Sequence, residues 1–508
     1  MKLKKIAALL AVAGMSAPAF ATNGMNLEGY GPVATAMGGA SFAYDNGTAA
    51  VMNNPATLAL SGQGSQFEVA LGFLGPNVDT KNNAFGSEGS SADAFYMPAI
   101  GYKNTVGKLT YGLGIFSQGG MGAEYSANSA MDATSHGTTF GGAAMTGGEK
   151  QRSELGVGRV SFPLAYQLSD QLTVGGSADF VWGGLDILWS EDSTGFFGAI
   201  DSSKVSAATS AKLAGFPVVP GGKRGSMGGT MIDTFVTNFA VVGGFSDFHW
   251  GHFDFSDNSA FAQEAMGYGY AGKLGFTYKV NDKLTIGGTY HSKTAMKDFE
   301  GDATLSFKVT TAAVDSVIPV KAKVQVVDFE WPETYGVGLA YQATDQLMIA
   351  ADYKRINWAD VMKNFHMKFT ADASQAGMAA TFANTVLDYE YYQNWDDQNV
   401  INLGGAYKVN DKLTLRAGYN YASNPVPKST VNFLFPATVE HHYTAGFGYA
   451  FSKASDFNFS LTYAPENKVT ESVVETLTGG GAARTTPKSA TTIGHSQINW
   501  QLLYSYKF

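Results

Sequence analysis

Apolar and polar residues alternate along most of this chain, and the segment 412–423 is a clear example. In that segment one set of alternate positions is apolar or aromatic, whereas the other set is mostly small or polar. The first set is Leu413, Leu415, Ala417, Tyr419 and Tyr421, and the second is Thr414, Arg416, Gly418 and Asn420. A period of two residues predicts a β-strand whose two faces meet different surroundings.

Short turns of similar sequence join such strands in pairs. The turn Val409-Asn410-Asp411-Lys412 separates the strand above from a preceding segment with the same alternation. Between the pairs run long stretches rich in Gly, Ser and Ala. Short turns on one side of a sheet and long loops on the other are typical of membrane β-barrels. Related turns lie at residues 103–110, 168–174, 280–286, 343–349 and 451–457.

The six short turns and seven long connections predict fourteen strands between residues 66 and 508. We therefore expect an all-β fold in which one 14-stranded antiparallel transmembrane barrel closes on itself, with a large external loop at residues 191–265. The expected strands are 66–74, 94–103, 108–116, 155–168, 171–190, 266–280, 283–300, 322–342, 346–358, 398–409, 412–423, 438–452, 456–464 and a last strand that runs through 498–508.

Composition agrees with a barrel and excludes several other classes of protein. No apolar run is long enough for a transmembrane helix, and the mean hydropathy is -0.07. Alternating strands can still cross a membrane, because their lipid-facing residues are averaged with polar ones. A soluble all-β protein is the alternative. The chain has no Cys, which excludes disulfides and thiolate sites, and its net charge of -9 argues against nucleic acid as a partner.

The N-terminus has the pattern of a secretory signal peptide, predicted at residues 1–21. Lys2, Lys4 and Lys5 precede an apolar run at residues 6–14, and Ala19-Phe20-Ala21 offers small residues for signal peptidase. The apolar run is too short for an anchoring helix, which is the alternative. The mature chain is then expected to begin at Thr22.

Residues 22–65 do not alternate and suggest short helices broken by tight bends. They contain Gly38-Gly39-Ala40, the pair Asp45-Asn46, and Asn54-Pro55-Ala56 between the signal peptide and the first strand. With these residues the chain resembles the FadL family of outer-membrane transporters for long-chain fatty acids and other hydrophobic compounds. The resemblance implies that residues 22–65 form a hatch that plugs the barrel lumen, with Gly38, Gly39, Asn54, Pro55 and Ala56 as hatch residues.

Alternation stops after Phe116, where Gly-rich sequence interrupts the third predicted strand. Glycine inside a strand marks a bulge, a bend or a close approach of another segment. In the FadL family the third strand carries an inward kink that opens the wall towards the bilayer. The resemblance implies such a lateral opening here, whereas the simple end of a strand is the alternative. The kink is expected at Ser117, Gln118, Gly119, Gly120 and Met121.

Three cations fall on the inward face by alternation, namely Arg159, Lys273 and Arg416, and each is a candidate for holding a ligand's acidic head group. The alternative is a structural ion pair with an inward acid such as Asp179 or Asp352. Fatty-acid transporters of the family place an Arg shortly after the start of the fifth strand. This chain has Gly183-Gly184 there, which leaves neutral hydrocarbons and aromatic compounds open as ligands.

The long connection at residues 191–265 is rich in aromatic side chains. We expect an external loop that captures apolar molecules, whereas a compact loop that buries its own rings is the alternative. His249 and His252 have metal-like spacing, but a surface cluster is the simpler interpretation, and no metal is predicted. The candidate capture residues are Phe245, Phe248, Trp250 and Phe253.

These observations predict passive uptake of long-chain fatty acids or related hydrophobic molecules through a hatch-gated barrel. A general porin and an outer-membrane lipid hydrolase are the alternatives, although no nucleophile constellation accompanies residues such as His291 and Ser292. The chain is expected to be a monomer without a cofactor, in contact with outer-membrane lipid and lipopolysaccharide. Its terminal Phe508 resembles the signal that the barrel assembly machinery recognises.

Overall fold

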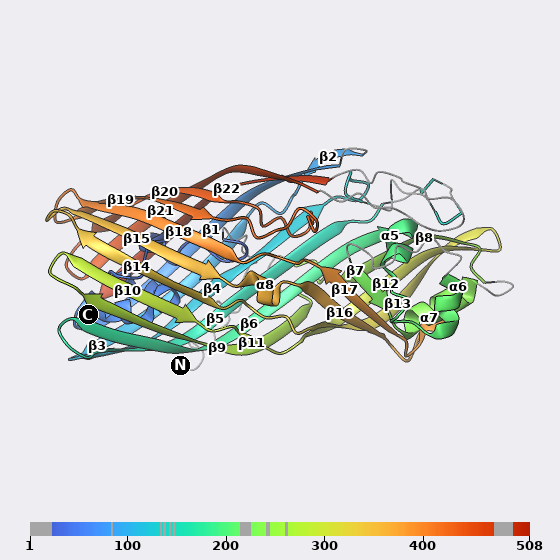
Figure 1. Cartoon of the computed structure of the whole chain (residues 1–508), viewed down its shortest axis with the longest axis horizontal. Helices are drawn as coiled ribbons and strands as arrows, with labels where there is room; N and C mark the ends of the chain where they lie inside the picture. The colour runs from blue at the N-terminus through green and yellow to red at the C-terminus, as the bar shows by residue number, and fades with distance from the viewer. Residues whose placement is uncertain are drawn as a thin grey trace.

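The computed structural model describes residues 23–82, 85–132, 135, 139–141, 144–145, 148–213, 225–239, 244–259, 263–471 and 491–508. The predicted signal peptide lies outside the described residues. The strands belong to one sheet whose first strand pairs with its last, so the sheet closes into a barrel (Figure 1). No helix in the described part of the chain is long and apolar enough to span a membrane.

The strands that close the barrel follow one another in sequence order, and each is antiparallel to its neighbours. They are β1 (Gly64–Asn82), β3 (Phe95–Val106), β4 (Leu109–Tyr125), β5 (Gln151–Gln167), β6 (Leu172–Asp192), β9 (Ala265–Lys279), β10 (Leu284–His291), β14 (Thr334–Gln342), β15 (Leu347–Ile356), β18 (Gln398–Lys408), β19 (Leu413–Ala422), β20 (His441–Ala450), β21 (Ser455–Thr470) and β22 (Thr491–Lys507).

Burial follows the predicted alternation in the part of the wall near the short turns. On β9, for example, Leu274 and Phe276 are exposed while Lys273 and Thr277 are buried. The exposed set is apolar, which suits a surface covered by lipid, and the buried set faces the lumen. The predicted inward direction of Arg159 and Lys273 is therefore confirmed, since both are buried.

In the recurring short turns an Asn side chain accepts hydrogen bonds from the backbone, which explains the repeated sequence. Asn410 accepts hydrogen bonds at its Oδ1 from the backbone N–H groups of Lys412 (2.9 Å) and Leu413 (3.0 Å). Asn281 does the same for Lys283 and Leu284, each at 2.9 Å. Asn can replace a backbone acceptor in this way, so the repeated motif marks real turns. They gather at one end of the barrel, on the left in Figure 1.

The complete sheet has 22 strands, so the expected number of fourteen is wrong for the sheet as a whole. Most of the further strands extend the wall beyond the opposite end, on the right in Figure 1, where short helices pack on them. The further strands are β2 (Gly86–Gly89), β7 (Gly225–Gly228), β8 (Asp247–Phe255), β11 (Ala295–Met296), β12 (Phe299–Thr311), β13 (Val314–Val327), β16 (Asn364–Ala371) and β17 (Val386–Tyr392). The helices that follow β1 in the chain are α5 (Ser193–Ala199), α6 (Ala207–Leu213), α7 (Thr230–Phe239), α8 (Trp358–Val361) and the 3-10 helix η3 (Gly377–Phe382).

Two expected strands are wrong in extent. The segments 283–300 and 322–342 are each interrupted, because β10 ends at His291 and β14 begins only at Thr334. Between these residues the chain leaves the wall and forms the external hairpin β12–β13. Alternation continues through both parts, since the hairpin also has one buried and one exposed face. A period of two therefore could not mark the place where the chain leaves the wall.

The segment before β1 folds into short helical turns, as predicted, and β1 begins at Gly64, two residues before the expected start of the first strand. Almost every residue of this segment is buried. We call residues 23–62 the hatch segment. Its elements are α2 (Pro32–Thr35), the 3-10 helix η1 (Gly47–Ala49), α3 (Ala50–Asn53) and the 3-10 helix η2 (Pro55–Ser61).

Candidate functional site

The hatch segment lies inside the barrel and touches strands on all sides of it. Its backbone at Gly38 donates a hydrogen bond to Thr444 of β20 (3.0 Å). Thr48 reaches β1, and Asn54 reaches β9. Because these strands lie at separate positions around the ring, the hatch segment crosses the lumen and does not lie along one wall.

Two buried carboxylates of the wall hold backbone groups of the hatch segment. Glu68 on β1 accepts hydrogen bonds from the backbone N–H (2.7 Å) and the hydroxyl (2.5 Å) of Thr48. Asp352 on β15 accepts from the backbone N–H groups of Ser41 (2.6 Å) and Phe42 (3.2 Å). Charge-assisted bonds of this kind are stronger than neutral ones, so both carboxylates tie the hatch segment to the wall.

The Asn54-Pro55-Ala56 tripeptide combines a helix cap with a tie to the wall. Asn54 Oδ1 accepts from the backbone N–H of Ala56 (3.1 Å), which caps η2. Its Nδ2 donates to the carbonyl oxygens of Phe42 (2.7 Å) and Phe276 (3.0 Å). All three residues of the tripeptide are buried. One side chain therefore links η2, an earlier turn of the hatch segment and strand β9.

Gly38 and Gly39 form a turn where the hatch segment meets β18 and β19. Both residues have positive φ, 68° and 84°. A side chain at Gly38 would come within 2.5 Å of the Tyr419 backbone, and one at Gly39 within 2.1 Å of the Glu28 carbonyl oxygen. Only glycine satisfies both the backbone conformation and the close approach.

The predicted kink contains a β-bulge that is pressed against the start of the hatch segment. The β4–β5 register shifts between Ser117 and Gly119, which leaves Gln118 as the extra residue. Gln118 donates from Nε2 to Asn26 Oδ1 (2.8 Å), and its carbonyl oxygen accepts from the hydroxyl of Tyr30 (2.6 Å). Burial raises the pKa of the Tyr30 hydroxyl well above its ordinary value, so the group stays neutral.

Pairing between β3 and β4 stops at the base of this kink. The last matched pair is Ile100 with Ile115. Beyond it residues 95–99 pair with β1 and residues 116–125 pair with β5, but the two segments do not pair with each other. Instead Gly119 forms a β-bridge with Asn26 of the hatch segment, Gly120 donates to the Met25 carbonyl oxygen (3.1 Å), and Glu124 accepts from the backbone of Ser91 (2.9 Å). The β3–β4 ladder is therefore interrupted beyond Ile100 and Ile115, and the hatch segment takes part of the place of β3 beside β4. Met97, Phe116 and Met121 on these edges belong to the same buried apolar cluster as Leu27 and Met52 of the hatch segment.

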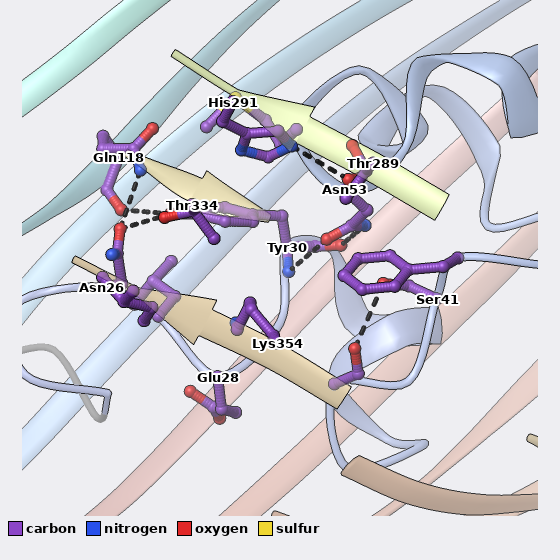
Figure 2. A pocket seen from close by; sticks show the side chains of 15 residues that line it. Asn26, Glu28, Tyr30, Ser41, Asn53, Gln118, Thr289, His291, Thr334 and Lys354 are labelled. Carbon is purple, nitrogen blue, oxygen red and sulfur yellow. Dashed lines mark hydrogen bonds between the residues drawn. The ribbon is translucent and has the colours of Figure 1, made fainter. Parts of the chain in front are cut away.

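A small cavity of about 30 Å³ lies next to Gln118 of the kink (Figure 2). The hatch segment, the kink and strands β10, β14 and β15 all contribute to it, and most of the side chains are polar. This volume is enough for about one water molecule. The nearly complete burial of the hatch segment and the small size of this cavity leave little free space among the described residues at this level of the lumen. The labelled lining residues are Asn26, Glu28, Tyr30, Ser41, Asn53, Gln118, Thr289, His291, Thr334 and Lys354.

Arg159 and Lys273 converge on a single acid. Arg159 donates to Asp179 Oδ2 (2.9 Å) and to the hydroxyl of Thr294 (3.1 Å). Lys273 donates to the same Asp179 oxygen and to the hydroxyl of Ser161. These contacts form the structural ion pair with an inward acid that was the alternative to a ligand-binding role for both residues. Asp179 balances one of the two positive charges, so the trio keeps one net positive charge if all three groups are ionised.

Arg416 lies apart from this pair, on β19, and donates to Asn458 Oδ1 (3.1 Å).

Lys354 on β15 was missed by the sequence reasoning, although it stands two residues after the inward Asp352 and so shares its face. Lys354 lines the small cavity together with Glu28. Alternation could have identified it, because the same rule selected the other three cations.

The candidate capture residues of the loop 191–265, all of which lie in its described part, are packed together and do not form an open groove. Phe245, Phe248, Trp250 and Phe253 are at most 8% exposed. Phe248 contacts Phe196 and Phe235, with ring centroids 4.8 and 5.1 Å apart. The structure thus has the alternative arrangement, a compact loop that buries its own rings.

The two histidines with metal-like spacing point to different partners. His249 Nε2 lies 2.9 Å from the Thr310 hydroxyl, and His252 Nδ1 lies 2.8 Å from the Ser190 hydroxyl. Within the described ranges, the group with suitable metal-ligand spacing is His366, Asp388 and Glu390. Lys204 Nζ lies 2.7 Å from Glu390 and 3.7 Å from Asp388, so a lysine supplies positive charge there.

Comparison with known proteins gives consistent relatives over the whole chain. Residues 8–501 match the family described as outer membrane protein transport protein (OMPP1/FadL/TodX). The toluene transporter TodX of Pseudomonas putida is 29% identical, with a TM-score of 0.73 over 95% of this chain and 99% of that chain. The Ralstonia pickettii toluene transporter TbuX is 30% identical, with a TM-score of 0.67 over the same shares of the two chains.

Curated sequences match over shorter lengths. Outer membrane protein P1 of Haemophilus influenzae is 24% identical over 217 residues, which are 42% of this chain and 42% of that protein. The curated relatives are matched over 37% to 51% of their own length.

Proposed function

Because this chain belongs to the outer membrane transport protein family OMPP1/FadL/TodX, we propose that it carries hydrophobic molecules across the outer membrane by passive diffusion. The molecule enters from the external end, reaches the hatch segment and leaves sideways between β3 and β4 into the bilayer. The hatch segment acts as the gate. The chain works as a monomer, since one chain completes the barrel.

The observation that carries this proposal is the interrupted pairing between β3 and β4 beside an inward kink. A closed ladder offers no passage through a barrel wall, whereas here β3 and β4 part beside Met97 and Phe116, and the hatch segment bonds to the β4 edge at Gly119 and Gly120. Movement of the hatch segment would free this apolar gap. Little free space is left among the described residues at this level of the lumen, so a lateral exit is the shorter route to the bilayer. A general porin would need an open aqueous lumen, which disfavours that alternative.

Capture of a ligand requires high affinity, whereas its release into the bilayer requires low affinity. Burial of an apolar ligand contributes roughly 0.8 kcal/mol per methylene, so capture needs no further energy source. Release needs a second state with lower affinity, and movement of the hatch segment supplies it by shifting the population of the two states. Two similar structures are named as toluene transporters, which supports hydrophobic molecules as the substrate class.

Deletion of Gln118 tests the lateral exit, because it removes the extra residue of the bulge and restores a regular β4–β5 register. The matched control is Gln118→Ala, which keeps the bulge and removes the hydrogen bond to Asn26. We expect uptake of labelled toluene to fall to the level of cells without the gene for the deletion and to persist for Gln118→Ala. Normal uptake by the deletion variant would contradict the lateral exit.

Substrate class is tested by competition between labelled toluene and labelled oleate in cells with and without the gene. Equal uptake of both compounds in the two strains would contradict transport altogether. Recognition of Phe508 by the assembly machinery and contact with lipopolysaccharide stay predictions.

A further inference from the structure

A groove of about 560 Å³ lies on the outer face of the wall, where β9, β10, β14 and β15 run side by side. We call it the outer groove. Volumes of this size are typical of sites that hold small apolar molecules. Its walls are large apolar or aromatic side chains, which come from all four strands and are exposed on the outside of the barrel. These wall residues are Leu274, Phe276, Tyr290, Tyr335, Val337 and Tyr353.

The outer groove results from an outward position that has no side chain. On the outer face Gly288 of β10 pairs with Phe276 of β9 on one side and with Val337 of β14 on the other. Phe276 and Val337 are exposed, whereas Gly288 between them is buried. A side chain at Gly288 would come within 2.6 Å of the Phe276 ring. The surface is therefore hollow at Gly288 and raised by side chains on both sides of it.

Two of the rings that form the walls are fixed by hydrogen bonds. The Tyr290 hydroxyl donates to Glu333 Oε1 (2.6 Å), and the Tyr353 hydroxyl donates to Asn399 Oδ1 (2.8 Å). Because these bonds hold both rings in place, a ligand does not have to order them. A site that is formed before its ligand arrives binds at a lower cost in conformational entropy.

The outer groove lies at the external ends of β10 and β14. Tyr290 is the last exposed residue of β10, and Tyr335 is the first exposed residue of β14. Beyond these strand ends the side chains become charged, and Lys293 pairs with Glu330 (2.5 Å). Tyrosines followed by charged residues mark the boundary between the hydrocarbon and the head groups of a membrane. The outer groove therefore faces the hydrocarbon of the external leaflet.

The position of the outer groove in the membrane selects its occupant. Water is absent at this depth, so an acyl chain has to cover the apolar walls. A chain in the groove contacts protein on several sides, whereas a chain beside a flat part of the wall contacts it on one side. Each atom contact is weak, but the contacts add, and an unfilled groove would lose them. Lipopolysaccharide forms the external leaflet of an outer membrane, so its acyl chains are the ones that reach this groove.

We propose that the outer groove is a lipid-binding site that holds one acyl chain of a lipopolysaccharide molecule. The site gives the expected contact with lipopolysaccharide a definite place on the barrel. It lies on β9, β10, β14 and β15, whereas the proposed lateral exit lies between β3 and β4. Lipid binding in the outer groove is therefore independent of the proposed transport function.

Val337→Trp tests the proposal, because a larger side chain at this wall fills the outer groove. The matched control is Val69→Trp, the same substitution at an exposed position of β1 outside the groove. The full-length proteins are purified from outer membranes whose lipopolysaccharide is truncated to lipid A and inner core and so has a uniform mass. Native mass spectrometry in mild detergent then identifies the retained lipid by its mass. We expect wild type and Val69→Trp to retain one lipopolysaccharide molecule, and the retained fraction to fall on the order of tenfold in Val337→Trp.

Leu274→Trp, at another exposed wall position, is a second variant in case Val337→Trp does not fold. Equal retention of lipopolysaccharide by wild type and both groove variants would overturn the proposal. Loss of a phospholipid in place of lipopolysaccharide would overturn it too, because the groove would then hold a different lipid. Uptake of labelled toluene should be unchanged in both variants. Its loss in Val337→Trp but not in Val69→Trp would assign the groove to the transport route and overturn the proposal, whereas absence of uptake by wild type would overturn the proposed transport function alone.

Discussion

The pattern of buried and exposed residues differs between the two ends of the barrel wall. On β18, near the short turns, Ile401 and Leu403 are exposed while Asn402 between them is buried. On the external half of β6, every residue from Gly183 to Ser190 is buried. The strand is continuous across this change, so the backbone does not cause it. The difference lies in what covers each face.

Near the short turns one face meets lipid and the other meets the hatch segment, so alternate residues need different chemistry. Towards the external end both faces meet protein, since consecutive residues of β6 are buried and aromatic rings of β8 and β17 pack on Trp189. Trp189 and Phe253 stack there with centroids 4.3 Å apart. A strand buried on both faces loses its alternation, and its stability depends on packing instead of on lipid.

Replacing an aromatic side chain by Ala should show the largest difference in lost stability between the two regions. Phe248→Ala empties a site among Phe196 and Phe235 and should cost about 3–5 kcal/mol of the stability of the external sheet. Phe162→Ala removes the same group from the lipid face of β5, where Phe162 is 54% exposed and lipid can fill the space, so it should cost less than half as much. Hydrogen exchange of the amides in β8 and β5 measures both, and equal losses would contradict the distinction.

A charge on the lipid face should have the next largest effect. Leu403 stands in the middle of β18, so Leu403→Arg should destabilise the barrel by about 2–4 kcal/mol. Val317 is equally exposed on the external hairpin but shares its face with Lys321 and Lys323, so Val317→Arg should stay within about 0.5 kcal/mol. Denaturant unfolding of the protein in lipid vesicles measures both variants. A similar loss in both would mean that Val317 also faces lipid.

Loss of one tie between the hatch segment and the wall should have an intermediate effect. Asn54→Ala leaves the carbonyl oxygens of Phe42 and Phe276 without this donor and should cost the hatch segment about 1–3 kcal/mol. Faster hydrogen exchange confined to residues 23–62 is the expected result. Asn77→Ala, at an exposed position of β1, is the control and should leave exchange unchanged.

The smallest effect is expected at the external ion pair. Lys204 contacts Glu390 at 2.7 Å and is partly exposed, so Lys204→Met should cost about 0.2–1 kcal/mol, and less at high salt. Thermal unfolding at two salt concentrations measures it. A large stabilisation of wild type by added divalent metal would show instead that His366, Asp388 and Glu390 bind an ion.

The sequence by itself determined the strands near the short turns, the turns and the inward direction of Arg159 and Lys273. These features depend on residues within one or two positions of each other, and a period of two or an Asn cap is visible without any partner. The resemblance carried by Gly38-Gly39-Ala40 and Asn54-Pro55-Ala56 placed the segment before β1 apart from the wall. The β-bulge at Gln118 lies among the residues where the kink was expected, because glycines mark places where side chains cannot fit, whereas the lateral opening stays a prediction.

Only the tertiary structure decided where the chain leaves the wall, which rings are buried and which charges pair. Alternation runs on from β10 into the external hairpin because both have one covered face, although the cover differs. Phe245 and Phe253 are buried because distant strands pack on them, and Arg159 meets Lys273 because Asp179 lies between their strands. The residues that pack on a strand face, and the residue that pairs with a charge, lie far away in the chain. A local sequence pattern therefore cannot predict them.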